Sequence, residues 1–169
     1  EQIRTSRTGR FWKVYNNSDF KLVLAFVDPT TKTGGLIKGQ KFIQFLNELI
    51  GVSRFEDLSI PLRIVATNYW NKEEVVLSKG NLLKAVQASY SMPGLFVPVK
   101  IGRILLVDGG LTNPLPYDTI KNDCDVTVGI DVSAKGTHGS TEFPPAYDIL
   151  FAAFQIMQRT IVSEKLKYV

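Results

Sequence analysis

The residues with the clearest potential for chemistry stand in the stretch ILLVDGGLTNPLP, from Ile104 to Pro116. An apolar run leads directly into Asp108, and two glycines follow it. An Asp-Gly pair is a common turn, so one interpretation of Asp108 is purely structural. The other is a carboxylate at the carboxyl end of a buried strand, where α/β folds form their binding crevices. A partly desolvated carboxylate there is a stronger base than in water, and the glycines let a backbone or a substrate approach closely.

A second segment, AVQASYSMPGLFVPV, combines a small-residue helix end, a Pro-Gly turn and a hydrophobic strand. Ser89 and Ser91 lie close to Pro93 in it, but neither stands in the GxSxG elbow typical of a nucleophilic serine. Close packing of a helix on a sheet explains this segment without any function. The chain therefore offers a candidate base with no recognisable nucleophile.

Other kinds of site have little basis in the sequence. There is no GxGxxG and no P-loop, and GGLIKGQ does not follow directly on a strand. The one histidine, His138, lies in a small-residue loop, where we expect it to be exposed. The one cysteine, Cys124, is flanked by aspartates that disfavour a thiolate, so we expect a partly buried structural residue. We expect no cofactor and no metal.

Composition indicates one ordinary soluble globular domain over residues 1–169, with 44% apolar and 21% charged residues. No apolar run approaches the roughly 18–20 residues that span a bilayer, and the polar, basic start does not resemble a signal peptide.

The net charge of +4 is modest. Its most regular part is a set of basic residues at every third position: Arg4, Arg7, Arg10 and Lys13. They predict either a solvated face or arm, or contact with anionic lipid headgroups and thus with a membrane surface. The other basic residues are scattered, so we expect no nucleic-acid partner.

Apolar spacing predicts strands that alternate with helices, and thus an α/β layered fold with a mixed sheet. Strands are expected at 18–28, 62–68, 74–78, 95–101, 103–107 and 125–132, and helices at 36–50, 82–90, 117–122 and 145–167. Asp125–Val132 is mostly apolar, which is typical of a strand buried on both faces. The last helix places Ile149, Leu150, Ala153, Ile156, Met157 and Ile161 near one face.

Taken together, these segments resemble the patatin-like phospholipase family in its bacterial branch. The matching pieces are GGLIKGQKF, FEDLSIPLRIVATN, AVQASYSMPGLFVPV, LVDGGLTNPLP and DVTVGIDVS. Each is weak alone, but the combination in this order is specific and covers about Gly34 to Ser133.

The resemblance implies a three-layer α/β/α fold with a mixed, mainly parallel central sheet. It also implies a lipid acyl hydrolase, a phospholipase or esterase of lipid degradation, with a Ser–Asp dyad. The family's nucleophile sits in a GxSxG elbow, and an upstream Gly-rich loop forms the oxyanion hole. Its aspartate belongs to a DG[GA] motif, which here is Asp108 with Gly109 and Gly110. Serine would attack the ester, Asp108 would act as the base, and no histidine is needed.

The sequence departs from the family in one large respect, because GxSxG and a Gly-rich loop at its start are both missing. We therefore expect the second half of a catalytic domain, incomplete at its N-terminal side and inactive alone. The absent initiator methionine and the final helix agree with a fragment. An incomplete sheet would favour self-association.

Two alternatives stay open. One is a catalytically silent patatin-like interaction or regulatory domain, and the other is an unrelated α/β binding module in which Asp108 is a turn residue. For location, the resemblance implies a cytoplasmic or membrane-associated protein, and we expect a cytoplasmic one.

Overall fold

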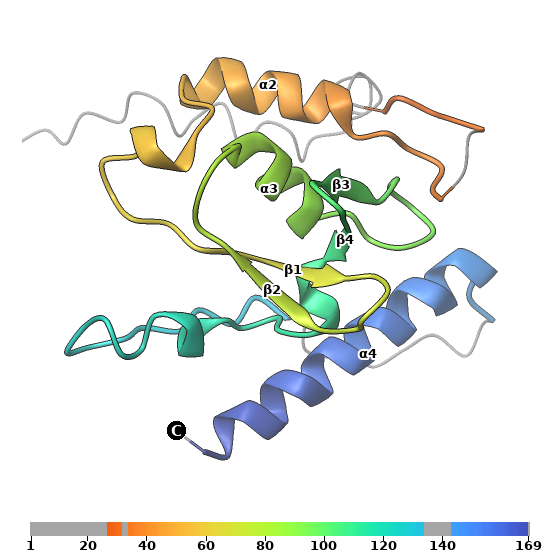
Figure 1. The fold of residues 1–169 in the computed structure, drawn as a ribbon. Coiled ribbons are helices and arrows are strands. Elements are labelled where there is room, and N and C mark those ends of the chain that lie inside the picture. The colour runs from red at the N-terminus through yellow and green to blue at the C-terminus, as the bar shows by residue number, and fades with distance from the viewer. Residues whose placement is uncertain (1–26, 32–33, 134–142, 169) are drawn as a thin grey trace, which may run out of the picture.

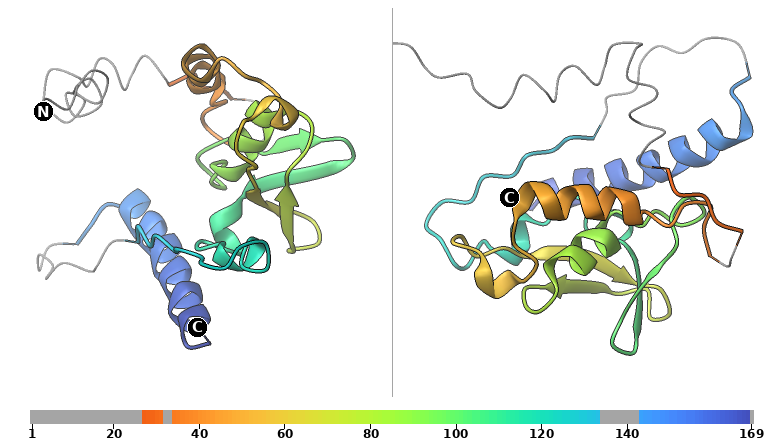
Figure 2. Two further views of the ribbon diagram at one scale, coloured as in Figure 1. Left: turned by 90° about the vertical axis from the view of Figure 1, so that its left-hand side faces the viewer. Right: turned by 90° about the horizontal axis from the view of Figure 1, so that it is seen from above.

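The structure is a computed structural model that describes residues 27–31, 34–133 and 143–168 (Figure 1). Its elements in chain order are α2 (Gln40–Ile50), η3 (Phe55–Asp57), β1 (Ile64–Asn68), β2 (Glu74–Leu77), α3 (Leu82–Ser89), β3 (Val99–Ile101), β4 (Ile104–Asp108), η4 (Gly109–Leu111), η5 (Tyr117–Thr119) and α4 (Ala146–Leu166). Helices α2 and α3 lie on one side of the sheet and α4 on the other (Figures 1 and 2). The expected α/β fold is confirmed.

The central sheet has the strand order β2-β1-β4-β3, and every neighbouring pair is antiparallel. The expectation of a mainly parallel sheet is therefore wrong for the part of the chain that the structure describes. The turn at 69–73 joins β1 to β2, and Gly102 and Arg103 join β3 to β4. Connections this short allow only antiparallel neighbours, since parallel strands need a long crossover.

Helix α3 packs its small residues against the sheet. Its N-cap is Asn81, whose side-chain oxygen accepts a hydrogen bond from the Lys84 N–H at 2.7 Å, and asparagine is among the residues preferred at this position. The buried residues fall into two clusters: Ala88 with Ala66, Val99 and Leu106, and Ala85 with Phe55 and Leu82. Alanines on the buried face let the helix lie close to β1 and β4.

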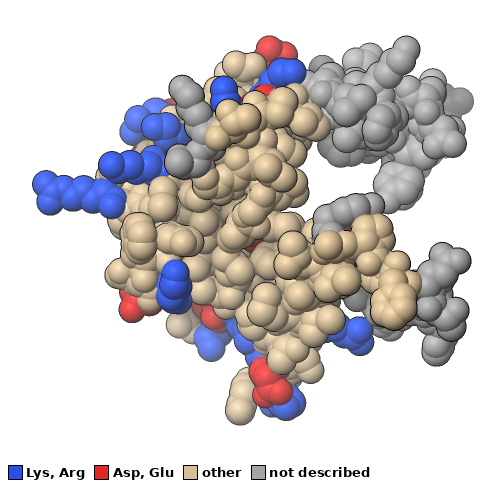
Figure 3. Space-filling model, turned by 90° about the vertical axis from the view of Figure 1, so that its right-hand side faces the viewer, with Lys and Arg blue, Asp and Glu red and all other residues tan. Residues whose placement is uncertain are grey.

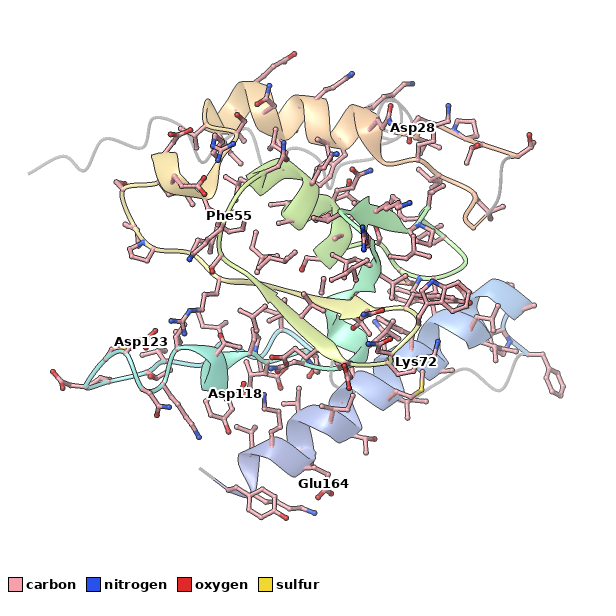
Figure 4. The ribbon with its side chains drawn as sticks, viewed as in Figure 1. Asp28, Phe55, Lys72, Asp118, Asp123 and Glu164 are labelled. Carbon is pink, nitrogen blue, oxygen red and sulfur yellow. The ribbon has the colours of Figure 1, made fainter. Side chains whose placement is uncertain are left out.

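Helix α2 is tied to the rest of the fold at its first turn. The carboxylate of Asp28 accepts hydrogen bonds from the Gly39 N–H at 2.7 Å and the Gln40 N–H at 2.8 Å, and it lies beside the start of α2 in Figure 4. The Tyr90 hydroxyl donates to the Gly39 carbonyl at 2.9 Å. Burial, with a contribution from the Asp28 charge, raises the pKa of Tyr90 to about 12, so this hydroxyl keeps its proton.

The buried strand expected at Asp125–Val132 is wrong. No strand is present there, and the side chains of Val126, Val128, Ile130 and Val132 are 76–88% exposed. No strand within the described residues pairs with this segment, so no neighbouring strand covers these apolar side chains.

The remaining expectations either need correction or concern residues that the structure does not describe. The helix expected at 117–122 is only the 3-10 turn η5. Cys124 is exposed rather than partly buried, and its Sγ lies 3.4 Å from the Ile120 carbonyl oxygen. His138, the basic residues at the start of the chain and all but the end of the strand expected at 18–28 lie outside the described residues.

The long C-terminal helix is confirmed as α4, but its packed face differs from the one expected. Phe154 and Val162 are buried and Gln158, Ile161 and Lys165 are half-buried, a spacing of three and four that follows one helix face. The apolar residues Ile149, Leu150, Ile156 and Met157 are exposed instead. No helix among the described residues is both long enough and apolar enough to cross a bilayer.

Candidate functional site

Asp108 is held in place through its backbone. It is the last residue of β4 and lies opposite Ala66 of β1. Its N–H donates to the Ser91 carbonyl at 2.9 Å, and its own carbonyl accepts a hydrogen bond from the buried Thr67 hydroxyl at 2.8 Å. Ser91, which follows α3, and Thr67 of β1 therefore together fix the backbone position of Asp108.

The Asp108 carboxylate has one oxygen held and one available. Oδ1 accepts a hydrogen bond from the Gly110 N–H at 2.7 Å, and Oδ2 bonds to none of the described residues. Burial raises the pKa of Asp108, and the hydrogen bond from Gly110 offsets only part of that effect. A carboxylate with a raised pKa and a free oxygen is suited to accept a proton.

The two glycines after Asp108 are required by close contacts. A Cβ added to Gly109 would lie 2.2 Å from the Val65 carbonyl oxygen of β1. A Cβ added to Gly110 would lie 2.0 Å from Nε2 of Gln158 and 3.0 Å from Oδ1 of Asp108. The close backbone approach expected from the sequence occurs at Gly109, while Gly110 makes room for a side chain of α4.

Asp108 lines a polar pocket of about 340 Å³. The polar pocket is lined by Arg63, Ile64, Val65, Ser89, Asp108, Gly109, Gly110, Asn113, Pro114, Pro116 and Gln158. Of the two serines considered from the sequence, Ser89 lines this pocket. Ser91 does not, because it is fully buried and its hydroxyl donates to the Gln87 carbonyl at 2.6 Å.

An apolar hollow of about 370 Å³ adjoins the polar pocket and shares Gly110 and Gln158 with it. The apolar hollow is lined by Gly110, Leu111, Phe154, Ile156, Met157, Gln158, Thr160 and Ile161. The right-hand face of the molecule is largely uncharged, with most Lys and Arg side chains near its margins (Figure 3). Sequence reasoning missed Gln158, although its position four residues after Phe154 and three before Ile161 is a signal for a shared helix face.

A lysine on α4 anchors the segment that follows the glycines. Lys165 Nζ donates to Asp118 Oδ1 at 2.5 Å, to Asn113 Oδ1 at 2.6 Å and to the Leu115 carbonyl at 3.2 Å, and Figure 4 shows Asp118 beside α4. Burial alone would raise the pKa of Asp118, but the hydrogen bonds from Lys165 and Asn113 outweigh it and lower that pKa. Asn113, which lines the polar pocket, is thus held to α4 by Lys165.

The remaining charged and metal-binding possibilities are limited. The Arg63 guanidinium, at the rim of the polar pocket, donates to the Thr119 carbonyl and pairs with the Asp123 carboxylate. Its charge is therefore already compensated. No group of three or more His, Cys, Asp or Glu residues within the described ranges is placed to hold a metal ion.

The sequence model of the patatin-like phospholipase family matches residues 7–120, more than half of the chain. The chain therefore belongs to the patatin-like phospholipase family. The match includes Asp108, Gly109 and Gly110, and it starts and ends earlier than the 34–133 segment that carries the resemblance in the sequence.

Relatives occur in bacteria and animals. An uncharacterized NTE family protein of Mycobacterium tuberculosis H37Rv is 29% identical over 114 residues, which cover 67% of this chain and 32% of that protein. The neuropathy target esterase sws of Drosophila melanogaster is 28% identical over 127 residues, 73% of this chain and 9% of that protein. Patatin-like phospholipase domain-containing protein 7 of Mus musculus is 28% identical over 139 residues, 80% of this chain and 10% of that protein. The chain spans about a third or less of these relatives.

Proposed function

We propose that the chain supplies the aspartate base of a Ser–Asp dyad in a lipid acyl hydrolase, a phospholipase or esterase. The observation that carries this proposal is the state of Asp108. Its carboxylate is half-buried in a pocket, with Oδ1 bound by the Gly110 N–H and Oδ2 free of protein partners among the described residues.

The chemistry divides ester hydrolysis into two steps. A serine hydroxyl attacks the ester carbonyl carbon, its proton passes to Asp108, and the leaving alcohol takes that proton as the ester bond breaks. Water then attacks the acyl-enzyme, Asp108 accepts a proton from the water, and the proton returns to serine as the fatty acid leaves. An aspartate at its ordinary pKa of about 4 is a weak base, so burial of Asp108 makes both transfers easier.

The nucleophile has to come from outside these 169 residues, because their sequence contains no GxSxG. By this proposal the 169-residue chain alone does not hydrolyse esters. The complete protein acts on lipid esters, works in the cytoplasm and contacts membranes peripherally. The absence of the elbow also favours a second candidate, a catalytically silent interaction or regulatory domain.

Two measurements test the dyad. The chain is treated with a fluorophosphonate and weighed intact, and no adduct is expected. In the complete reading frame, Asp108→Asn is expected to lower kcat for a lipid ester about a thousandfold. Asp57→Asn, an exposed aspartate of η3, serves as the matched control and should leave kcat unchanged. Full activity of Asp108→Asn would overturn the dyad and favour the silent domain, and a stoichiometric adduct on the chain would point to Ser89 first.

A further inference from the structure

The polar pocket and the apolar hollow meet at one side chain. Gly110 and Gln158 line both, Asp108 lies in the polar pocket, and Phe154, Met157 and Ile161 line the apolar hollow. No charged residue lines the apolar hollow. Its volume of about 370 Å³ falls at the lower end of the roughly 300–1,000 Å³ typical of small-molecule sites. Such a surface favours a neutral alkyl chain over a charged headgroup.

Among the described residues, Gln158 is the one whose side-chain amide lines both spaces, whereas Asn113 lines the polar pocket alone. It is half-buried, and its amide bonds to none of the residues that the structure describes. Its Nε2 lies so close to Gly110 that a Cβ there would be 2.0 Å away. No buried side-chain nitrogen or oxygen among the described residues lacks a partner, so the Gln158 amide is open to solvent. Its N–H donors can therefore exchange water for an acceptor that a ligand brings in.

We infer that one fatty ester binds across this junction, with its acyl chain along Phe154, Met157 and Ile161 and its carbonyl oxygen at the Gln158 amide. The ester carbon then lies on the Asp108 side of the amide. Helix α4 thereby forms the acyl-binding wall of the site, and Gln158 fixes the position of the ester carbonyl along it. This inference rests on the proposed function and names the part of the chain that selects the substrate.

The test is a binding measurement, so it does not depend on catalysis. The 169-residue chain is titrated with the methyl ester of pyrenedecanoic acid, and in parallel with pyrenyldecane, a hydrocarbon of similar length that has no ester. Pyrene fluorescence gives the two dissociation constants. Gln158→Leu is expected to weaken binding of the ester about fivefold, the effect of one hydrogen bond, and to leave binding of the hydrocarbon unchanged.

A charge in the apolar hollow should act on both probes. Met157→Glu is expected to weaken both by more than about tenfold, because it places a carboxylate beside the alkyl chain. Leu150→Glu is the matched control, since Leu150 is an exposed apolar residue of the same helix that lines neither space. It should change neither constant by more than about twofold. Circular dichroism and melting curves confirm that all three variants fold alike.

Three results would overturn the inference: no saturable binding, equal effects of Met157→Glu and Leu150→Glu, or equal weakening of both probes by Gln158→Leu. These outcomes are separate from those of the dyad test. If Asp108→Asn abolishes hydrolysis but the binding results fail, only the acyl site is wrong. If the binding results hold but Asp108→Asn stays active, only the dyad is wrong.

Discussion

The backbone N–H of Asp108 donates a hydrogen bond to the carbonyl oxygen of Ser91 over 2.9 Å. The bond joins the end of β4 to the segment just after α3, so two of the five segments that carry the family resemblance meet at one point. The Ser91 hydroxyl is also engaged, since it donates to Gln87 at the last turn of α3. Ser91 thus positions Asp108 without being available for chemistry.

Ser91→Ala should lower the free energy of unfolding by about 1 kcal/mol, because it removes one buried hydrogen bond and leaves the Gln87 carbonyl without that partner. Urea unfolding followed by circular dichroism measures the change. Ser89→Ala is the control, since no hydrogen bond of the Ser89 side chain to a described residue would be lost, and it should shift stability by less than about 0.5 kcal/mol. Equal losses for the two variants would contradict this role.

Gly109→Ala should be among the most damaging single-methyl changes in the chain. The added Cβ would lie 2.2 Å from a β1 carbonyl oxygen, and a backbone atom inside a sheet cannot move aside cheaply. We expect a loss of about 3 kcal/mol in the free energy of unfolding, at the upper end for overpacking. Gly129→Ala provides the comparison, because its Cβ would meet only Leu115 at 3.7 Å or more. If both glycines tolerate alanine equally, the contact at Gly109 is wrong.

The raised pKa of Asp108 predicts that Asp108→Asn increases the free energy of unfolding, and that the increase depends on pH. Because the folded-state pKa is raised by burial, the contribution of Asp108 to stability is fully present below its unfolded pKa of about 4. It is lost as pH rises through the folded pKa, where a partly desolvated charge has to form. Asparagine stays neutral at both pH values. The variant should therefore have the same free energy of unfolding as the parent in acid and a larger one near neutral pH. Urea unfolding at both pH values gives the difference, and a gain independent of pH would contradict the assignment.

The Lys165 anchor predicts the opposite pH trend. Lys165→Met should cost about 1–2 kcal/mol of unfolding free energy near neutral pH, allowing for the partial exposure of Asp118. Since the folded pKa of Asp118 is lowered, its contribution is present above its unfolded pKa and is lost as pH falls through the folded value. The cost of Lys165→Met should therefore shrink in acid. Lys167→Met removes an exposed pair with Glu164 and should cost less than about 0.5 kcal/mol at either pH.

Local signals in the sequence were good predictors of individual elements. Asn81 marks the start of α3, Gly51 follows the end of α2, and the turn at Gly102 separates β3 from β4. Each of these boundaries depends on the backbone preferences of one or two residues, so it can be predicted from the residue types alone. The Asp-Gly-Gly motif likewise predicted a close backbone approach, and Gly109 makes it.

Relationships between distant segments were much harder to predict. The antiparallel pairing of Ala66 with Asp108 depends on the route of the chain through α3 and β3, which no local pattern encodes. Apolar side chains were expected to define the packed face of α4, yet the half-buried Gln158 lies on that face and Met157 is exposed. Which face a helix buries depends on what lies beside it, and here that is the small Gly110.

The segment 125–132 shows the same limit and leads to the last prediction. Its composition is that of a buried strand, but the side chains of Val126, Val128, Ile130 and Val132 are exposed and no described strand pairs with it. Unpaired backbone groups flanked by apolar side chains are a template for pairing with another chain. We therefore expect the chain to associate with itself as its concentration rises, and sedimentation velocity measures this directly.

Charges on the segment 125–132 should prevent that association. Val128→Lys with Ile130→Lys places two like charges on side chains that are 77% and 76% exposed, so the fold should tolerate them while edge-to-edge pairing becomes unfavourable. Ile149→Lys with Leu150→Lys adds the same charge on exposed positions of α4 and should leave the association unchanged. A parent chain that stays monomeric at high concentration would contradict the prediction. Equal effects of the two double variants would show that net charge, not this segment, controls the association.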